Sequence, residues 1–427
     1  MKKFYSVLLI LFISLNSFSQ FKNIKLAEQD DKSYPPADPS IAINKRNPKN
    51  IVAVTGRNRV IITSDGGQAW TTTEIKSSFG VYGKPAVISN SKGHFFYFHL
   101  SDPGGKGRGI VCRNSIDDGA TWGEEVSIGN NPPADQDKVW PAVHPKKNEV
   151  FVTWTQFDNE SSEAGCQSNI LFSKSGNGNR FSKPIHVNET SGDCLNDDNT
   201  AMGAMTAIGT DGKIYVTWAN QEKIYLDRSY DDGNTWLSND LIVTKQEGGW
   251  ALNIPGIERC NGLPVLAIDN SMGRYHGTLY LLWADQRNGA NDTDIWLMKS
   301  RSRGDMWSKP LRINKDEAGS HQFLPWIAVD QTNGSVYIIY YDRRDYDDLQ
   351  TDVYLAYSFD GGNNFSEVKI NETPFTPDAS KFFGSHINID AHADVITPIW
   401  TRMDNGQTST WTSIIKESDL PKSQIKK

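Results

Sequence analysis

The sequence comprises 427 residues with a formal net charge of -7, so the chain is acidic overall. An acidic balance does not favour nucleic acids or anionic membranes, and we expect neither as a partner. Its length allows two or three domains, and the internal pattern has to decide between these and one large domain.

Residues 1–19 have the pattern of a secretory signal peptide. Lys2 and Lys3 form a basic start, residues 7–13 (VLLILFI) form an apolar core too short to span a bilayer, and residues 17–19 (SFS) suit cleavage. No Cys follows that would carry a lipid anchor, and no later run is apolar enough to cross a membrane. We therefore expect a secreted or periplasmic protein.

A short turn sequence recurs six times along the chain. The clear copies are 64–70 (SDGGQAW), 115–122 (SIDDGATW), 229–236 (SYDDGNTW) and 358–365 (SFDGGNNF), and degenerate copies occupy 173–181 and 300–307. In such a turn an Asp accepts backbone hydrogen bonds, a Gly supplies positive φ, and the aromatic ring packs into the neighbouring layer. We expect Asp65, Asp118 and Asp232 to stabilise their turns rather than bind a ligand.

This turn resembles the Asp-box (BNR) repeat, S-x-D-x-G-x-x-W, of the sialidase-like β-propeller family. As architecture, the resemblance covers nearly the whole chain after the signal. It implies a propeller in which the Asp boxes lie on the face away from the substrate.

A longer repeat places four strands in each unit. The clearest strand runs are 263–269, 279–287, 294–297 and 310–314, followed in the next unit by 324–330, 336–344 and 352–355. β-Branched and aromatic residues dominate these runs, and turn residues separate them. Four-stranded units repeated at about 50 residues are typical of propeller blades.

First strands begin at seven places, and the last unit has only three strands of its own. The seven starts are 39–43, 85–88, 141–143, 204–208, 264–268, 325–329 and 386–389. Residues 21–26 resemble the outer strands, so we expect them to complete the last blade and remove two exposed edges. This predicts an all-β, seven-bladed propeller over residues 20–417 with a polar tail at 418–427; the alternative is six blades.

Because successive strands of a blade alternate in direction, the loops between them fall on two opposite faces of the propeller. The links entering each first strand share a face, around the mouth of the channel, with the turns between second and third strands. Candidate acid/base residues there are Asp38, Asp102, Asp285 and Asp342. Candidate substrate-binding residues there are Arg57, Lys84, Trp140, Arg287, Arg343, Arg344, His321, His386 and Arg402.

The repeated pairs Asp285/Arg287 and Asp342/Arg344 have two interpretations. An arginine fork can hold a carboxylate of an acidic sugar bidentately. Alternatively, each Asp and Arg satisfy each other and brace the blades. Arg57 and Arg402 lack an obvious repeat partner, which favours a binding role for these two.

The family resemblance implies a catalytic set that this sequence does not carry. Sialidases have an F-R-I-P motif before the inner strand of the first blade, whereas this chain has Pro36-Ala37-Asp38-Pro39. Three function classes follow. The chain is an exported glycoside hydrolase acting on an acidic glycan at the channel mouth, a non-catalytic propeller that binds glycan or protein, or a polysaccharide lyase that uses His or Tyr.

Four cysteines remain, and export permits disulfides. We expect a Cys166–Cys194 disulfide because these residues lie in successive irregular segments, and Cys194–Cys260 is the competing pair. Cys112 lies within a strand run. No spacing indicates zinc, and no cofactor is required. The acidic stretches 291–294 and 345–352 offer hard oxygen ligands that could hold Ca²⁺.

Overall fold

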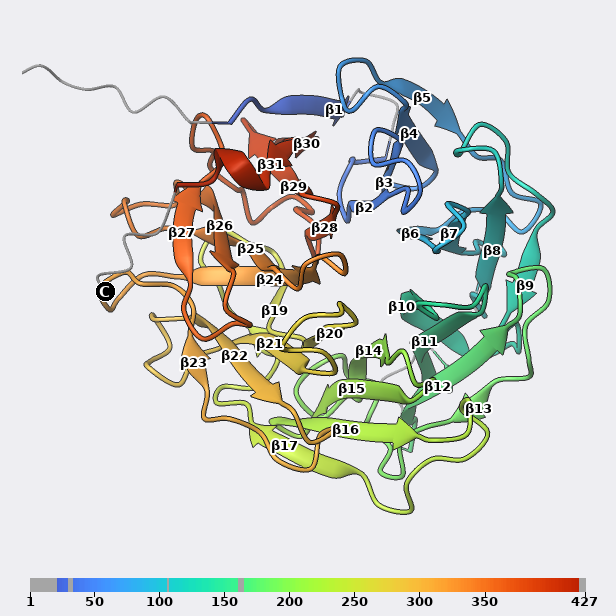
Figure 1. The fold of residues 1–427 in the computed structure, drawn as a ribbon. Coiled ribbons are helices and arrows are strands. Elements are labelled where there is room, and N and C mark those ends of the chain that lie inside the picture. Colours follow the sequence, from blue (N-terminus) through green and yellow to red (C-terminus); the bar gives the residue numbers. More distant parts are fainter. Residues whose placement is uncertain (1–20, 30–33, 106, 160–164, 422–427) are drawn as a thin grey trace, which may run out of the picture.

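Seven antiparallel sheets surround a central channel, as Figure 1 shows looking along its axis. The computed structural model describes residues 21–29, 34–105, 107–159 and 165–421. The expected signal peptide, 1–19, lies outside the described residues. The seven-bladed prediction is confirmed, and the six-bladed alternative is wrong.

Each of the first six blades runs outward from the channel as four sequential strands. The strands are β2 (Ser40–Ile43), β3 (Ile51–Thr55), β4 (Arg59–Thr63) and β5 (Thr71–Glu74); β6 (Gly83–Ser89), β7 (Phe95–Leu100), β8 (Ile110–Ser115) and β9 (Val126–Ile128); β10 (Asp135–Val143), β11 (Val150–Phe157), β12 (Ser168–Ser175) and β13 (Ile185–His186); β14 (Met202–Ile208), β15 (Ile214–Asn220), β16 (Lys223–Ser229) and β17 (Leu241–Lys245); β20 (Val265–Ile268), β21 (Leu279–Asp285), β22 (Asp294–Ser300) and β23 (Leu311–Arg312); β24 (Gln322–Val329), β25 (Val336–Asp342), β26 (Asp352–Ser358) and β27 (Ser366–Lys369).

The second strands of the first six blades are buried along their whole length. β7, β11, β15, β21 and β25 have no half-buried or exposed position. Because neighbouring blades cover both faces of each sheet, these strands are apolar on both sides instead of alternating. The core is therefore a ring of side chains between blades, and function is left to the loops at the two ends of the channel.

The seventh blade closes the ring with strands from both ends of the chain. It consists of β28 (Asn388–His392), β29 (Val395–Asp404), β30 (Gln407–Thr412) and β1 (Ile24–Glu28), and a short β31 (Ile415–Lys416) also pairs with β29. β1 runs antiparallel to β30, with Ile24 opposite Thr412. The closing strand predicted at 21–26 thus begins three residues later. The side chain of Asn23, just before it, donates to the carbonyl of Ile370 at 2.8 Å and ties this end to the sixth blade.

The four clear turn sequences share one hydrogen-bond pattern. The backbone N–H groups of Ala69, Thr121, Thr235 and Asn364 donate to the carboxylates of Asp65, Asp117, Asp231 and Asp360, respectively. The expectation for Asp65 agrees with this, but in the other two turns the backbone N–H donates to the Asp before Asp118 or Asp232. The Asp118 carboxylate instead accepts from Asn44 Nδ2 at 2.8 Å. Asp118 and Asp232 have φ of 62° and 59°, so they supply the turn's backbone bend while the preceding Asp accepts its hydrogen bonds.

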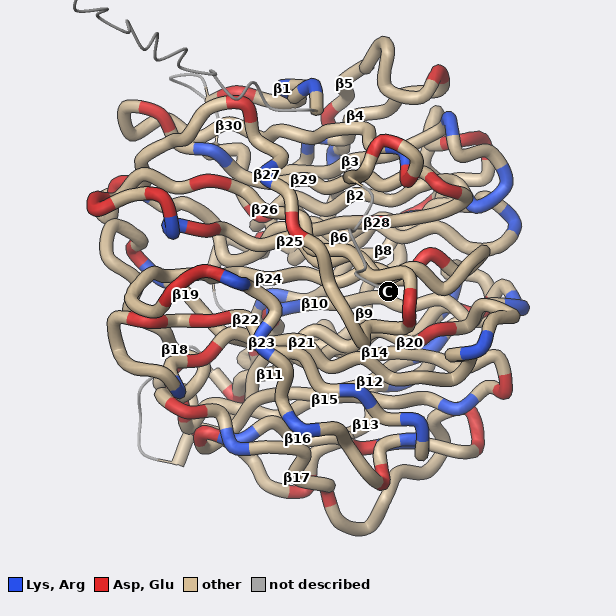
Figure 2. Tube along the Cα trace, turned by 60° about the vertical axis from the view of Figure 1, so that its left-hand side comes forward, with Lys and Arg blue, Asp and Glu red and all other residues tan. Residues whose placement is uncertain are grey.

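Charged residues of both signs are interspersed along the chain, as Figure 2 shows from the side. In the described ranges the single helix is the three-residue η1 (Glu417–Asp419), and no helix there is long and apolar enough to cross a bilayer. A small hairpin, β18 (Ala251–Leu252) and β19 (Cys260–Asn261), is inserted between the fourth and fifth blades. We call residues 250–261 the mouth insertion.

Candidate functional site

A recurring backbone irregularity shapes the channel mouth. The pairing register of β6, β10, β14 and β24 shifts at one place in each strand, and Lys84, Lys138, Gly203 and Leu324 adopt positive φ at these shifts. Asp38, just before β2, has φ of 53°. Left-handed backbone is uncommon for residues other than glycine, and bulges redirect side chains. In the first three blades this geometry is adopted by charged residues, namely Asp38, Lys84 and Lys138.

These three residues meet at the hydroxyl of Ser385, in the link before the seventh blade. Lys138 Nζ donates to Ser385 Oγ at 2.7 Å, and Lys84 Nζ donates to the same oxygen at 3.2 Å. Lys84 also forms an ion pair of 3.2 Å with Asp38. Asp38 accepts from the Ser385 hydroxyl at 2.9 Å and from its backbone N–H at 2.6 Å. We call Asp38, Lys84, Lys138 and Ser385 the mouth cluster.

The two lysines of the cluster have opposite pKa shifts. Burial alone would lower the pKa of Lys84, but Asp38 and then Asp137 raise it above its usual value. Burial and the nearby Lys84 lower the pKa of Lys138 to about 8, against the opposing effect of Asp38. Burial would raise the pKa of Asp38, but Lys84, His386 and Lys138 hold it well below its usual range. Asp38 and Lys84 are therefore ionised at neutral pH.

An aromatic plug closes the channel directly below the cluster. The ring centroids of Trp140 and Trp326 lie 4.5 Å apart, and His386 meets Trp140 edge-on at 4.8 Å. Burial lowers the pKa of His386 to about 3, so its imidazole is neutral. The plug separates the mouth from a cavity of about 450 Å³ on the opposite face, lined by the first strands.

Above the plug lies a pocket of about 320 Å³. Its floor contains Lys84, Lys138 and Ser385, and its walls include Asp137 and Phe382 from the entry links. The mouth insertion contributes further wall residues, among them Trp250, Glu258, Arg259 and Asn261. Charged and aromatic side chains thus surround one ligand-sized space, which we call the mouth pocket.

Hydrogen bonds from three blades hold the mouth insertion over the pocket. Arg343 Nη1 donates to the carbonyl of Pro255 at 2.6 Å, and Asn261 Nδ2 donates to that of Ser385 at 2.8 Å. The backbone N–H of Ala251 donates to Asp198 at 2.8 Å. The insertion is consequently a fixed wall of the pocket.

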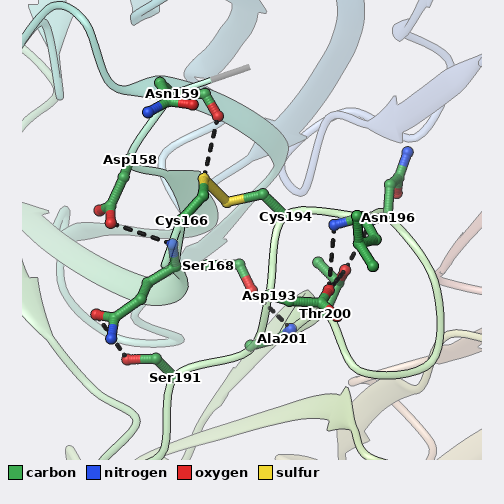
Figure 3. The surroundings of a disulfide bond; sticks show 12 residues. Asp158, Asn159, Cys166, Ser168, Ser191, Asp193, Cys194, Asn196, Thr200 and Ala201 are labelled. Carbon is green, nitrogen blue, oxygen red and sulfur yellow. Dashed lines mark hydrogen bonds between the residues drawn. A yellow bond between two sulfur atoms is a disulfide. The ribbon is translucent and has the colours of Figure 1, made fainter. Parts of the chain in front are cut away.

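A disulfide braces the neighbouring loop on the same face. Cys166 and Cys194 form a disulfide, which confirms the pairing of the two successive irregular segments. Cys112 and Cys260 are free and buried. Figure 3 shows Cys194 next to the tight loop at 193–200, in which Thr200 donates to Asp193. The carbonyl of Thr200 accepts from the indole of Trp250 at 3.2 Å, which connects the bridge to the pocket wall.

The repeated Asp and Arg pairs satisfy each other. Arg287 approaches Asp285 to 2.5 Å, and Arg344 approaches Asp342 to 2.6 Å and Glu367 to 2.8 Å. These contacts agree with the bracing interpretation. Both carboxylates are fully buried.

The remaining candidates are held outside the mouth cluster. Arg402, expected to lack a partner, forms an ion pair of 2.5 Å with Asp404 in its own turn. Arg57 is exposed and lies over the Tyr34 ring, and Asp102 is exposed as well. His321 bonds Thr293 Oγ1 through Nδ1 at 3.1 Å. Of the predicted set, the structure therefore brings together Asp38, Lys84, Trp140 and His386.

Sequence reasoning missed Ser385 and Arg259 as site residues, and it placed Lys138 on the entry links of the mouth without choosing it as a substrate-binding residue. The usable signal for Lys138 is its position in the entry link, in the same slot as Asp38 and Lys84 at the start of a first strand. Over the described part of the chain, no group of three or more His, Cys, Asp or Glu residues is arranged to hold a metal ion.

Comparison with known proteins gives matches among solved structures. A Hadza microbial sialidase is 12% identical, with 87% of this chain and 74% of that chain covered and a TM-score of 0.51. The GH93 α-L-arabinofuranosidase of Fusarium graminearum with arabinobiose is 10% identical, covering 94% and 99%, with a TM-score of 0.51. A PL25 ulvan lyase bound to -[GlcA(1-4)Rha3S]- is 11% identical, covering 93% and 96%, with a TM-score of 0.52.

No protein-family model and no curated protein matches the sequence. Similarity at 10–12% identity is a similarity of fold. The chain therefore has the fold of the sialidase-like β-propellers.

Proposed function

We propose that this chain is an exported, carbohydrate-active propeller whose mouth pocket binds an acidic glycan through Lys84, Lys138 and Arg259. The observation that carries the proposal is the uncompensated charge of Lys138. Among the described residues its ammonium has no carboxylate within ion-pair distance, and its one hydrogen-bond partner is Ser385 Oγ. A buried ammonium with unused donors is a favourable position for an incoming anion.

The pocket walls suit a sugar that carries such an anion. The half-buried Phe382 offers aromatic surface for a sugar ring, and Asn261 adds a polar side chain at the edge. Arg259 lines the same space and also affects the pKa of Lys138. The binding cations in this proposal are thus two lysines and one arginine, because Arg287, Arg344 and Arg402 of the strand turns are each paired with a carboxylate of the protein.

The comparisons support the carbohydrate class. The three structural neighbours described above are a sialidase, an arabinofuranosidase and an ulvan lyase, and the lyase is bound to a glycan containing GlcA, a uronic acid. Each of these activities belongs to the neighbour. Their common feature, action on a carbohydrate, is the part of the proposal that they support.

Within the carbohydrate class we favour hydrolysis, with proton transfer by an acidic residue of the pocket wall. Asp137 and Glu258 line the pocket together with the lysines. Asp38 is held ionised by Lys84, so it orients the cluster and does not donate a proton. A glycosidase generally needs two carboxyl groups in different protonation states.

Binding by the lysines is testable with one variant and a matched control. Lys138→Gln should weaken binding of a uronate-bearing oligosaccharide by about 10- to 100-fold, equivalent to roughly 1.5–3 kcal/mol for a charged hydrogen bond. The carboxyl-reduced analogue should bind both proteins equally. Lys381→Gln, an exposed lysine in the same entry link as Ser385, should leave both affinities unchanged. Isothermal titration calorimetry measures all six values, and an equal loss for the acidic and neutral sugars contradicts the proposal.

A further inference from the structure

The backbone and side chain of Ser385 are fixed in one position. Its N–H donates to Asp38, its carbonyl accepts from Asn261, and its hydroxyl contacts Asp38, Lys84 and Lys138. Gly384 precedes it with φ of 109°. The residue is only partly buried and lines the mouth pocket. A serine hydroxyl is thus held at the floor of an accessible pocket, within hydrogen-bond distance of two amines.

The two amines beside this hydroxyl have different states. Lys84 is paired with Asp38 and remains an ammonium ion. Lys138 has no such partner, and a neutral fraction exists near neutral pH since burial and Lys84 lower its pKa. An amine next to a second cation is a known way to make a base that works near pH 7. The charged or titratable groups that face Lys138 are Lys84, Arg259, Asp38, Asp137, His386 and Cys260.

We propose that Ser385 and Lys138 form a nucleophile–base pair that removes small acyl groups from esters, such as an O-acetyl group on a sugar. This activity goes beyond glycan binding and hydrolysis, although the choice of a sugar as the ester's carrier rests on the proposed function. Lys138 Nζ donates to Ser385 Oγ at 2.7 Å, so when this ammonium loses a proton, the amine lone pair is within reach of the hydroxyl proton, as a base beside its nucleophile must be. The nearest fixed positive charge is Lys84 Nζ, 3.2 Å from the same oxygen.

The reaction has two balanced halves. Ser385 Oγ attacks the ester carbonyl carbon while neutral Lys138 takes the hydroxyl proton, and Lys84 stabilises the oxyanion. The intermediate then expels the sugar alkoxide, which receives the proton from Lys138, and leaves an acyl-serine. Water attacks that ester, gives one proton to Lys138, and the acid departs as Ser385 recovers its proton. No oxidant, metal ion or cofactor takes part.

The first experiment uses the unaltered protein. A fluorophosphonate probe loses fluoride to an activated serine hydroxyl, and mass spectrometry of the digested adduct locates the label. We expect labelling at Ser385, faster at pH 9 than at pH 6 because neutral Lys138 is the base. No adduct at Ser385, or equal labelling at other serines such as the half-buried Ser191, overturns the proposal.

The second experiment measures hydrolysis of p-nitrophenyl acetate, which carries no glycan. Ser385→Ala and Lys138→Arg should lower kcat/KM at least 100-fold, while Ser191→Ala should leave it unchanged. Ester hydrolysis that survives Lys138→Arg overturns the base assignment. If the unaltered protein hydrolyses p-nitrophenyl acetate but binds no acidic glycan, that result contradicts only the proposed function.

Discussion

Lys138 Nζ donates to Ser385 Oγ at 2.7 Å, and this contact joins the third blade to the seventh across the channel mouth. The two residues are far apart in sequence, so only closure of the ring brings them together. Lys84 and Asp38 add the second and first blades to the same contact. The mouth cluster therefore depends on the seven-bladed geometry, and its charge state has consequences for stability and for binding.

The lowered pKa of Lys138 predicts a pH dependence of stability. Its folded pKa is about 8, below the ordinary value near 10.4. Between these values the unfolded chain binds more protons, so this residue makes stability rise with pH over that window. Lys84, whose folded pKa is raised, loses its contribution only at higher pH.

The variant Lys138→Met lacks the titrating amine, so Lys138 no longer contributes to the pH dependence of its unfolding free energy. The unfolding free energy of the unaltered protein minus that of the variant should therefore increase from pH 7 to pH 10, as urea denaturation at several pH values would show. A difference that stays constant or falls over this range would contradict the charge state assigned to Lys138.

The Asp117 carboxylate accepts hydrogen bonds from Thr121 N–H at 2.9 Å and from Ser115 Oγ at 2.8 Å. Asp117→Ala should lower the unfolding free energy by about 1 kcal/mol, because the turn loses these bonds. Asp232→Asn is the control, since the Asp232 side chain makes no hydrogen bond to any described residue and Asn also tolerates positive φ. We expect a change within about 0.5 kcal/mol for the control. Glycan binding per folded molecule should not change in either variant, and its loss in stably folded Asp117→Ala would assign the turn a binding role.

The Cys166–Cys194 bridge closes a loop with a sequence separation of 28 residues. Replacing both cysteines with serine should lower the unfolding free energy by on the order of 3 kcal/mol, because the unfolded chain gains freedom. Reduction of the unaltered protein should give the same midpoint as the double variant in urea, and reductant should not affect that variant. Identical midpoints for oxidised and reduced protein would show that the bridge does not contribute to stability.

Much of the fold could be predicted from the sequence because its signals are local. Apolar strand runs, the repeated turn and an incomplete last unit were enough for seven blades and for the closing role of the N-terminal strand. The bracing of Asp285 by Arg287 was also visible as a spacing of two residues. Arg402 has the same spacing in reverse order, with Asp404 two residues after it as its partner. The expectation that Arg402 lacks a partner considered only pairs in which the Asp comes first.

The site was less predictable because its parts are common residues in separate links. Lys138 and Ser385 carry no motif, and their approach depends on a register shift in β10 and on ring closure. Adjacent aspartates at 117 and 118 gave no local reason to choose the first as the acceptor. Such choices depend on backbone φ and on contacts across blades, which sequence spacing does not contain.

The central claim is that a carboxylate on the glycan is what the mouth pocket recognises. Its most direct test is a calorimetric titration of the unaltered protein at pH 7 with a GlcA-bearing tetrasaccharide and with its carboxyl-reduced counterpart. The account predicts that the acidic sugar binds at least about tenfold more tightly, a difference of roughly 1.4 kcal/mol. Equal dissociation constants for the two sugars, or tighter binding of the neutral one, would contradict it.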